Sequence, residues 1–363
     1  MNIYGITYDH TTNYGSCFQA FALKRAIEGI EISKEGCKYS LIPIRAFKDW
    51  PGKRRFNPLT SFHRLRFFPF EKQYMKFAGV NRLCDLSSLN QDADAFVCGS
   101  DVIWNPKTNF LLKAFFLDFA TCYKFSYAAS FGTAEISDDY VKSVKDSISS
   151  LDSISCREPS GCSIISQMGE SARVVVDPIL LLDNREWNGI IDKEHRNDKY
   201  IFVYVTHYTD EVAKFVANLK NTTGLRVTTT AWNTSPRVLL KHGILQVKTP
   251  KKWLQLLRDA EYVVTNSFHA TAFSVLFHKK FFTVVSGEKD KGINIRMDDF
   301  LRTIGLGGRI YNTVPETLDL SEIDYTDADR IIEKMRADSM DYLKRNLQAA
   351  YEQKLRSEAK EPV

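Results

Sequence analysis

Residues 261–285 restrict the possible folds of this chain more strongly than any other stretch of the sequence. It begins with an apolar run rich in β-branched residues (262–264), passes through a polar corner (265–267), and continues with apolar residues at helical spacing before a second apolar run (281–285). A strand, a short helix and a second strand in this order form a crossover unit with parallel strands. Because parallel sheets carry helices on both faces, the stretch predicts the α/β fold class.

The same alternation recurs along the chain and divides it into two series. Strand-like runs of the first series lie at residues 3–8, 38–43, 95–98, 125–129, 153–156 and 174–176, and those of the second at 200–205, 225–229, 243–247, 261–264 and 281–285. A highly charged stretch, 183–199, separates them, and one long amphipathic helix or two are expected at 328–358. We therefore predict two α/β domains, 1–182 and 183–325, followed by a helical tail, 326–363.

The polar corner is the first candidate site. Ligands of open α/β sheets bind outside the carboxyl ends of the strands, where the free N–H groups of helix N-termini attract anions. The corner places Asn266 and Ser267 at such an end and His269 in the first helical turn, so it is a candidate anion site with an imidazole beside it. The pattern fits equally well a Ser267 that only caps the helix and a His269 that only packs.

Polar residues also follow strand-like runs of the first series. Asn13, Asp101, Ser130 and Arg157 occupy such positions. Because loops at the carboxyl edge of a parallel sheet converge in space, we expect these four residues to be neighbours. A cleft between the two domains is where a small-molecule site is expected.

Motifs for common cofactors are missing from the sequence. No GxGxxG follows the first strand-like run and no P-loop motif occurs, which argues against dinucleotide and P-loop sites. The paired aspartates at 92 and 94, and at 298 and 299, are typical of solvated helix ends. We therefore predict neither a cofactor nor a metal site.

Six segments in a fixed order carry a family resemblance. They are NYGSCFQAFAL (13–23), FVCGSDVIWNP (96–106), YAASFG (127–132), SCREPSG (155–161), VVVDPILLL (174–182) and TNSFHATAFS (265–274). Together they resemble the polysaccharide pyruvyl transferase family. The resemblance implies two Rossmann-like domains that face each other across a cleft, as in glycosyltransferases of the B type. It also implies transfer of an enolpyruvyl unit from phosphoenolpyruvate to two hydroxyls of a sugar, which forms a cyclic ketal and releases phosphate.

The resemblance implies roles for individual residues. His269 would be the catalytic acid or base, and Arg157 would bind the donor. Asp101 would be the second catalytic residue, lying near the reacting hydroxyls and dividing the acid and base roles with His269. Many family members carry an arginine two positions before the histidine, where this chain has Ser267. Arg296 is our candidate for the missing cation, although a surface salt bridge would explain it equally well. The expected donor-binding residues are Arg157, Ser267, Arg296 and Asn266. The expected acceptor or cleft residues are Asn13, Tyr14, Ser100, Trp104, Ser130 and Phe131.

The segment 45–82 interrupts the strand and helix pattern and is strongly basic. It holds ten Lys or Arg against two acidic residues, whereas the whole chain has a net charge of only +5. Aromatic residues are interleaved with the basic ones. This mixture suits an anionic membrane surface or an acceptor sugar linked to undecaprenyl diphosphate. A helical insertion that covers the cleft explains it as well, and no nucleic-acid module accompanies the charge, so nucleic acid is not an expected partner.

The remaining sequence features concern location. A strand-like run begins at residue 3, where a signal peptide would need a basic and then an apolar region, and no run of about 18 apolar residues indicates a membrane span. Seven cysteines without a CxxC pair are typical of a reducing compartment. We expect a cytoplasmic enzyme of capsule or exopolysaccharide synthesis that contacts the membrane peripherally. The alternatives are a nucleotide-sugar glycosyltransferase of B-type fold and a non-catalytic carbohydrate-binding relative.

Overall fold

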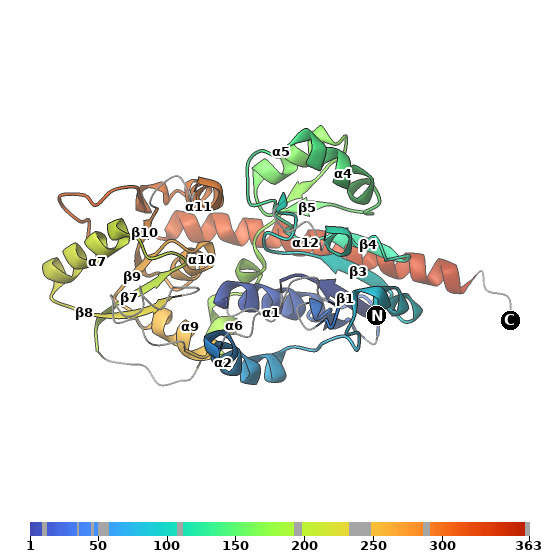
Figure 1. The fold of residues 1–363 in the computed structure, drawn as a ribbon, viewed down its shortest axis with the longest axis horizontal. Helices are drawn as coiled ribbons and strands as arrows, with labels where there is room; N and C mark the ends of the chain where they lie inside the picture. The colour runs from blue at the N-terminus through green and yellow to red at the C-terminus, as the bar shows by residue number, and fades with distance from the viewer. Residues whose placement is uncertain are drawn as a thin grey trace.

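Two parallel sheets lie side by side in the computed structural model, which describes residues 1–8, 13–34, 36–44, 47–49, 58–106, 112–191, 198–231, 248–285 and 291–359 (Figure 1). The first sheet has the order β2-β1-β3-β4 and the second the order β11-β10-β9-β7-β8. The strands of the first are β1 (Asn2–Ile6), β2 (Lys38–Leu41), β3 (Ala95–Cys98) and β4 (Tyr123–Ser126). Those of the second are β7 (Tyr200–Val205), β8 (Arg226–Ala231), β9 (Tyr262–Thr265), β10 (Lys280–Val284) and β11 (Ile310–Tyr311). The α/β fold class predicted from the sequence is thus confirmed.

Helices connect the strands and cover the sheets. In the N-terminal part they are α1 (Tyr14–Glu28), α2 (Pro58–Tyr74), α3 (Leu112–Phe115), α4 (Asp138–Ser149) and α5 (Pro159–Gln167), with a 3-10 helix η2 (Leu83–Gln91). In the C-terminal part they are α7 (Asp210–Thr223), α9 (Pro250–Arg258), α10 (Phe268–Leu276) and α11 (Lys291–Thr303), with η6 (Gly307–Arg309). The linking stretch holds η4 (Pro178–Leu181) and α6 (Asn184–Asn188). Among the described residues, no helix is both long and apolar enough to cross a bilayer.

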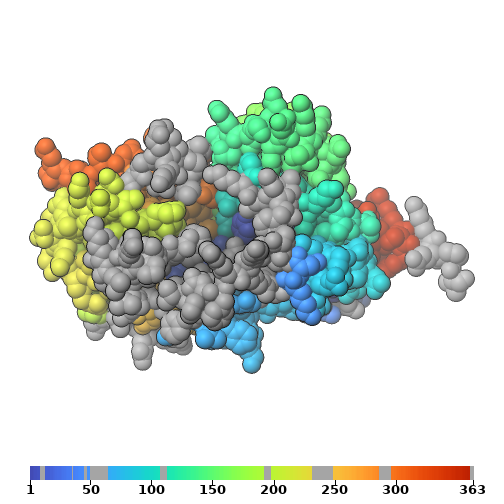
Figure 2. Space-filling view, viewed as in Figure 1, coloured from blue at the N-terminus to red at the C-terminus, as the bar shows by residue number. Residues whose placement is uncertain are grey.

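A small two-stranded sheet, β5 (Ser155–Cys156) and β6 (Arg173–Val174), continues the first domain. Single bridges at Phe125–Ser153 and Ala129–Cys156 tie it to the end of β4. Figure 2 shows the region of α4 and α5, in green, rising beside the yellow and orange C-terminal domain. Arg157, which follows β5, therefore lies at the same edge of the domain as Asp101 and Ser130, which follow β3 and β4.

An aromatic core joins the two domains. The rings of Tyr14 and Trp253 stack with their centres 4.9 Å apart. The centre of the Phe273 ring lies 5.3 Å from that of Phe18 and 4.8 Å from that of Trp187. These side chains come from α1, α6, α9 and α10, so one continuous buried cluster spans both domains. An apolar interface of this kind fixes the angle between the domains more firmly than a polar contact would.

The C-terminal helix α12 (Thr326–Glu358) runs behind both domains (Figure 1). Near its start, the Tyr325 hydroxyl donates to the carbonyl of Lys279 in the C-terminal domain. Further along, the Tyr342 hydroxyl donates to the carbonyl of Ser126, and Ser339 Oγ accepts from the Val176 N–H, both in the N-terminal domain. The tail is therefore one helix rather than two.

Two predicted elements differ from the structure. Asn13, expected in a loop after the first strand, is the N-cap of α1, because its side chain accepts from the Gly15 N–H. The runs at 153–156 and 174–176 form strands of only two residues each, β5 and β6. The predicted strand at 243–247 lies outside the described residues.

Candidate functional site

His269 lies where the N-termini of two helices meet. It is in the first turn of α10, directly after β9, and is 6% exposed. The N-terminal turn of α1 packs against its ring so closely that a methyl group built on Gly15 would lie 2.0 Å from His269 Nδ1. Only a glycine allows this approach. Both helix N-termini direct partial positive charge toward the space around the imidazole.

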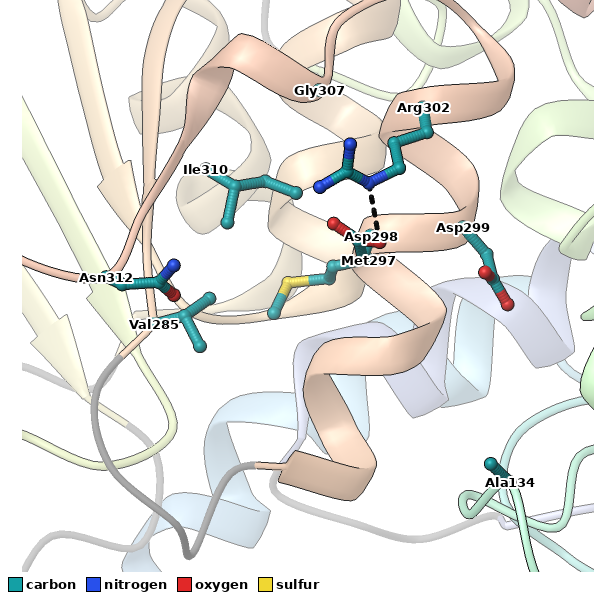
Figure 3. Close-up of a pocket in the computed structure, with 9 residues that line it drawn as sticks. All are labelled: Ala134, Val285, Met297, Asp298, Asp299, Arg302, Gly307, Ile310 and Asn312. Carbon is teal, nitrogen blue, oxygen red and sulfur yellow. Dashed lines mark hydrogen bonds and ion pairs between the residues drawn. The ribbon is translucent and has the colours of Figure 1, made fainter.

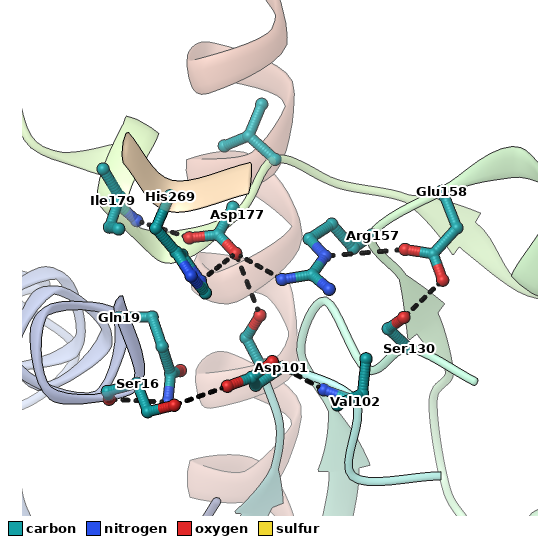
Figure 4. Close-up of polar contacts among 12 residues, drawn as sticks. Ser16, Gln19, Asp101, Val102, Ser130, Arg157, Glu158, Asp177, Ile179 and His269 are labelled. Carbon is teal, nitrogen blue, oxygen red and sulfur yellow. Dashed lines mark hydrogen bonds and ion pairs between the residues drawn. The ribbon is translucent and has the colours of Figure 1, made fainter. Parts of the chain in front are cut away.

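Asp177 is the centre of the polar network around this histidine (Figure 4). Its Oδ2 accepts from Arg157 Nη1 at 2.8 Å and from Ser100 Oγ at 3.5 Å. The same oxygen lies 3.5 Å from His269 Nε2, an ion-pair distance, and Nε2 makes no hydrogen bond to any residue that the structure describes. Asp177 caps η4 through Oδ1, which accepts from the Ile179 N–H, so the backbone holds the carboxylate in place.

Arg157, which follows β5, is held on three sides. Besides Asp177, its Nε lies 3.5 Å from Glu158 Oε2, and its guanidinium sits 4.7 Å from the centre of the Phe268 ring. Glu158 in turn accepts from Ser130 Oγ at 2.5 Å. Arg157 and Glu158 are almost fully buried, so these contacts fix the guanidinium in one orientation.

Asp101 follows β3 and reaches the network from the opposite side. Its backbone has φ +69°, a left-handed conformation that aspartate tolerates better than most residues. One carboxylate oxygen accepts from Ser16 Oγ at 2.8 Å and the other from the Val102 N–H at 2.9 Å. Gln19 Nε2 donates to the Ser16 carbonyl, which fixes the turn that carries Ser16.

The two buried aspartates are held ionised by their neighbours. Burial alone would raise the pKa of Asp177, but the charge of His269, and then the charge and hydrogen bond of Arg157, lower it well below its usual range. Burial likewise opposes ionisation of Asp101, yet His269, Arg157 and Arg296 lower its pKa. Both carboxylates are therefore ionised at neutral pH.

Arg296 brings a second cation from α11 of the other domain. Its side chain is partly buried. Burial and the like charge of Arg157 lower the pKa of Arg296 to about 10. Two guanidinium groups that repel each other in a partly desolvated place favour binding of an anion, because an anion would offset that repulsion.

Three nitrogen donors of the site lack partners. Arg157 Nη2, Arg296 Nε and His269 Nε2 are buried and make no hydrogen bond within the part of the chain that the structure describes. A cavity of about 200 Å³ lies between Arg157 and Arg296. Its other lining residues are Glu158, Pro159, Val174, Val176, Asp177, Leu180, Phe268, Asp299, Phe300, Thr303 and Met335. Because buried polar groups are normally satisfied, these donors indicate a site for a small anionic ligand.

The remaining predicted donor residues, Asn266 and Ser267, are buried beside His269. The Asn266 side chain is used by the fold, since its Oδ1 accepts from the Thr206 N–H and its Nδ2 donates to the His207 carbonyl. Ser267 occupies the N-cap position of α10, but its side chain makes no capping hydrogen bond.

The predicted acceptor residues lie in two different environments. Ser100 and Ser130 belong to the polar network, and Asn13 caps α1 beside it. The three aromatic residues point into the protein interior instead. Tyr14 packs between the domains and its hydroxyl donates to the Lys248 carbonyl, while Trp104 and Phe131 are fully buried and pack on each other at 5.4 Å. Interior packing and hydrogen bonding account for the position of these rings.

Sequence reasoning did not select several residues of the network. Asp177 lies in one of the six segments and directly follows a valine run, the same kind of strand end that pointed to Asp101 and Arg157. That signal could have found it. Glu158 follows the same strand end as Arg157, so the same signal applies to it. Nothing local distinguishes Gly15, whose role depends on its contact with the distant His269.

Comparisons with known proteins give one matching family and several similar solved structures. The family model described as Polysaccharide pyruvyl transferase matches residues 13–288. Among solved structures, a putative UDP-N-acetylglucosamine 2-epimerase from Listeria monocytogenes has a TM-score of 0.51 at 10% identity, covering 93% of this chain and 96% of its own. S. aureus MnaA with UDP has a TM-score of 0.49 at 12% identity and covers 93% and 96%. The E. coli heptosyltransferase WaaC with ADP has a TM-score of 0.42 at 12% identity and covers 92% and 100%. No curated protein matches the chain.

Proposed function

Because the chain belongs to the polysaccharide pyruvyl transferase family, we propose that it transfers the enolpyruvyl unit of phosphoenolpyruvate to two hydroxyls of a sugar. The products are a cyclic pyruvate ketal and phosphate. The observation that carries this proposal is the group of three buried donors without partners, contributed by Arg157, Arg296 and His269. Phosphoenolpyruvate has a carboxylate and a phosphate, and two arginines with free N–H groups offer one cation to each.

The reaction needs a proton donor and an anion-binding site. His269, when protonated, gives its proton to the methylene carbon of the donor, and the adjacent carbon becomes electrophilic. A sugar hydroxyl adds to that carbon and loses its proton to a base. A second hydroxyl of the same sugar then forms the second C–O bond, the C–O bond to phosphate breaks, and the proton of the second hydroxyl is released with the phosphate. The chain's contribution is to orient the donor and to position the acid and base.

Asp177 and Asp101 are positioning residues in this scheme. Asp177 contacts both Arg157 and His269, so it sets the distance between the donor-binding cation and the proton donor. Asp101 lowers the positive charge of the group without occupying the cavity, since its two oxygens are engaged by Ser16 and Val102.

Phosphoenolpyruvate is expected to raise the thermal stability of the protein in the presence of EDTA. A ligand that binds only the folded state stabilises it by about 2.7 kcal/mol at a hundredfold excess over its Kd. Arg157→Ala should abolish most of this shift, as measured by differential scanning fluorimetry. Arg173→Ala, which removes a half-exposed arginine of the same domain, is the matched control and should keep the shift. A shift produced only by nucleotide sugars would replace this proposal with the glycosyltransferase alternative.

The finer identity of the acceptor rests on α2. We propose that the acceptor sugar is linked to undecaprenyl diphosphate during capsule or exopolysaccharide assembly, and that α2 contacts the inner face of the membrane. Leu65 and Phe68 lie on one face of α2 with their side chains 69% and 58% exposed. Exposed basic residues, Arg64 and Lys72, accompany them on the helix. An apolar strip accompanied by basic residues is typical of a helix that lies in an anionic membrane surface.

The inward face of α2 explains why the helix stays on the protein. Phe67 packs on Tyr14 at 5.0 Å, and Phe70 packs on Phe18 at 5.6 Å. The helix therefore buries one aromatic face against α1 and presents Leu65 and Phe68 outward. Residues 45–46 and 50–57 of the predicted basic segment lie outside the described residues.

The double variant Leu65→Ser, Phe68→Ser is expected to lose at least about tenfold of its affinity for vesicles of phosphatidylglycerol and phosphatidylcholine, since each buried apolar side chain contributes about 1.5–3 kcal/mol. Arg64→Gln and Lys72→Gln should each weaken vesicle binding about fivefold, because each basic residue near an anionic surface contributes about 1 kcal/mol to the binding free energy. Sedimentation with vesicles measures both. Leu355→Ser, at an apolar residue of α12 that is 45% exposed, is the control and should bind as the parent does. Equal binding by all variants would remove α2 from the membrane proposal.

A further inference from the structure

A second, larger cavity lies beside α11. Its volume is about 520 Å³, and it lies at the carboxyl ends of β10 and β11, the edge of a parallel sheet where ligands bind (Figure 3). Its lining residues are Ala134, Val285, Met297, Asp298, Asp299, Arg302, Gly307, Ile310 and Asn312. Ala134 belongs to the N-terminal domain and the others to the C-terminal domain. The cavity is therefore between the domains, as the arginine cavity is.

The charges of this cavity do not suit an anion. Arg302 Nε donates to Asp298 Oδ2 at 2.7 Å, so its charge is already compensated. The carboxylate of Asp299 makes no hydrogen bond or ion pair with any residue that the structure describes. In Figure 3 it stands apart from the Asp298–Arg302 pair, on the side of α11 nearer Ala134. The uncompensated negative charge of Asp299 would repel a phosphate or a nucleotide, so a neutral ligand fits this cavity better.

The polar and apolar groups of the lining fit a polyhydroxylated ligand. Two carboxylates and the Asn312 amide offer acceptors and donors for hydroxyl groups. Val285, Met297 and Ile310 offer an apolar wall for the C–H groups of a pyranose ring. A pocket with an apolar wall and a few convergent polar groups is the usual form of a small-molecule site.

Asp299 joins the two cavities. It lines the larger cavity and also the cavity of Arg157 and Arg296. A sugar in the larger cavity would thus meet the bound donor at this carboxylate. Burial, together with the charges of Glu158 and Asp298, raises the pKa of Asp299, which makes it a stronger base than an ordinary aspartate. Asp101, the residue expected near the reacting hydroxyls, lines neither of these two cavities.

We propose that the acceptor sugar binds in the larger cavity beside α11 and that Asp299 accepts the proton of the first attacking hydroxyl. This inference rests on the proposed function. In the step concerned, the O–H bond of the sugar breaks, its proton goes to an Asp299 oxygen, and its electron pair forms the C–O bond to the donor carbon that bears the phosphate. His269 supplies the proton that the methylene carbon of the donor receives.

Filling the cavity tests where the sugar binds. The probes are methyl glycosides of glucose, galactose, mannose and N-acetylmannosamine, observed by saturation-transfer NMR with phosphoenolpyruvate present. The parent protein is expected to bind at least one of them, and Ala134→Trp should weaken that binding at least tenfold while its thermal shift with phosphoenolpyruvate stays unchanged. Lys142→Trp, which adds the same ring at an exposed position of α4, is the control and should bind as the parent does. Binding unaffected by Ala134→Trp, or no binding of any glycoside by the parent, would overturn the inference.

Phosphate release with the glycoside that binds tests the role of Asp299. Asp299→Asn should lower kcat by about 10²- to 10⁴-fold, as expected for a lost general base, with the phosphoenolpyruvate shift retained. Asp299→Glu should recover part of the turnover, and Asp327→Asn, which changes an exposed carboxylate of α12, should leave it unchanged. Near-parental turnover of Asp299→Asn would refute the base assignment alone. Absence of a phosphoenolpyruvate shift in the parent would instead refute the proposed function.

Discussion

Replacing His269 by glutamine is expected to lower kcat by about 10²- to 10⁴-fold while phosphoenolpyruvate binds within a few fold of the parent affinity. Glutamine keeps a hydrogen-bonding side chain next to Asp177 but cannot deliver a proton to the methylene carbon. Phosphate release measures kcat, and titration calorimetry measures donor binding. Near-parental turnover would show that His269 only packs between α1 and α10.

Gly15→Ala separates the position of the ring from its chemistry. The added methyl group would overlap the imidazole, so the ring must move although it remains a histidine. A displacement of about 1 Å costs about 10²-fold in rate when geometry matters to the reaction. The control is Gly79→Ala, since no atom of the described residues, its two chain neighbours aside, lies within 4 Å of a methyl group built there. If both alanine variants turned over like the parent, the close packing of α1 against His269 would have no part in the reaction.

The second large effect is expected on stability. Asp177→Asn should lower the free energy of unfolding by about 3–5 kcal/mol at pH 7, because it leaves the buried charge of Arg157 without its nearest partner. Urea unfolding followed by circular dichroism measures the change. Asp329→Asn is the control, since its pair with His278 is half exposed and should contribute less than about 1 kcal/mol.

The pH dependence of this difference follows from the direction of the shift. The pKa of Asp177 is lowered in the folded protein, so its contribution is fully present above the ordinary aspartate pKa of about 3.9 and is lost as pH falls below that value. The parent should therefore lose stability more steeply than Asp177→Asn between about pH 5 and pH 3. Parallel curves over this range would mean that Asp177 titrates normally and is not held ionised by Arg157 and His269.

The sequence could predict the fold because strand and helix signals are local. The run at residues 261–285 specifies a strand, a helix and a strand from its own residues, and β9, α10 and β10 lie there. The same reasoning about strand ends pointed to Asp101, Arg157 and His269, which the structure brings into one network. Parallel strands place such ends at one edge whatever the lengths of the intervening segments.

Side-chain direction could not be predicted in the same way. Tyr14 and Trp104 stand beside polar residues in their segments, yet both turn inward, because the partners that bury them, Trp253 and Phe116, come from other elements. The cavity beside α11 could not be predicted from the sequence either. Its walls include Ala134 and Asp299, which are distant in sequence, and the aspartates at 298 and 299 were interpreted as a solvated helix end. Two adjacent acidic residues in a sequence do not indicate which residues of other elements will lie opposite them in the folded protein.

The C-terminal helix limits how the two domains can move. At 1.5 Å per residue its 33 residues form a rod about 50 Å long, anchored to one domain at Tyr325 and to the other at Ser339 and Tyr342. Swinging the domains apart like a jaw would bend this rod or break its anchors. Rotation of one domain relative to the other about the helix axis does not bend the helix or break its anchors. The anchors at each end turn with their domain, and the helix twists slightly between them. Entry of a sugar between Ala134 and α11 is thus best served by a small screw-like rotation, which changes the width of that gap while Arg157 and Asp177, both N-terminal to the linking stretch, keep their contact.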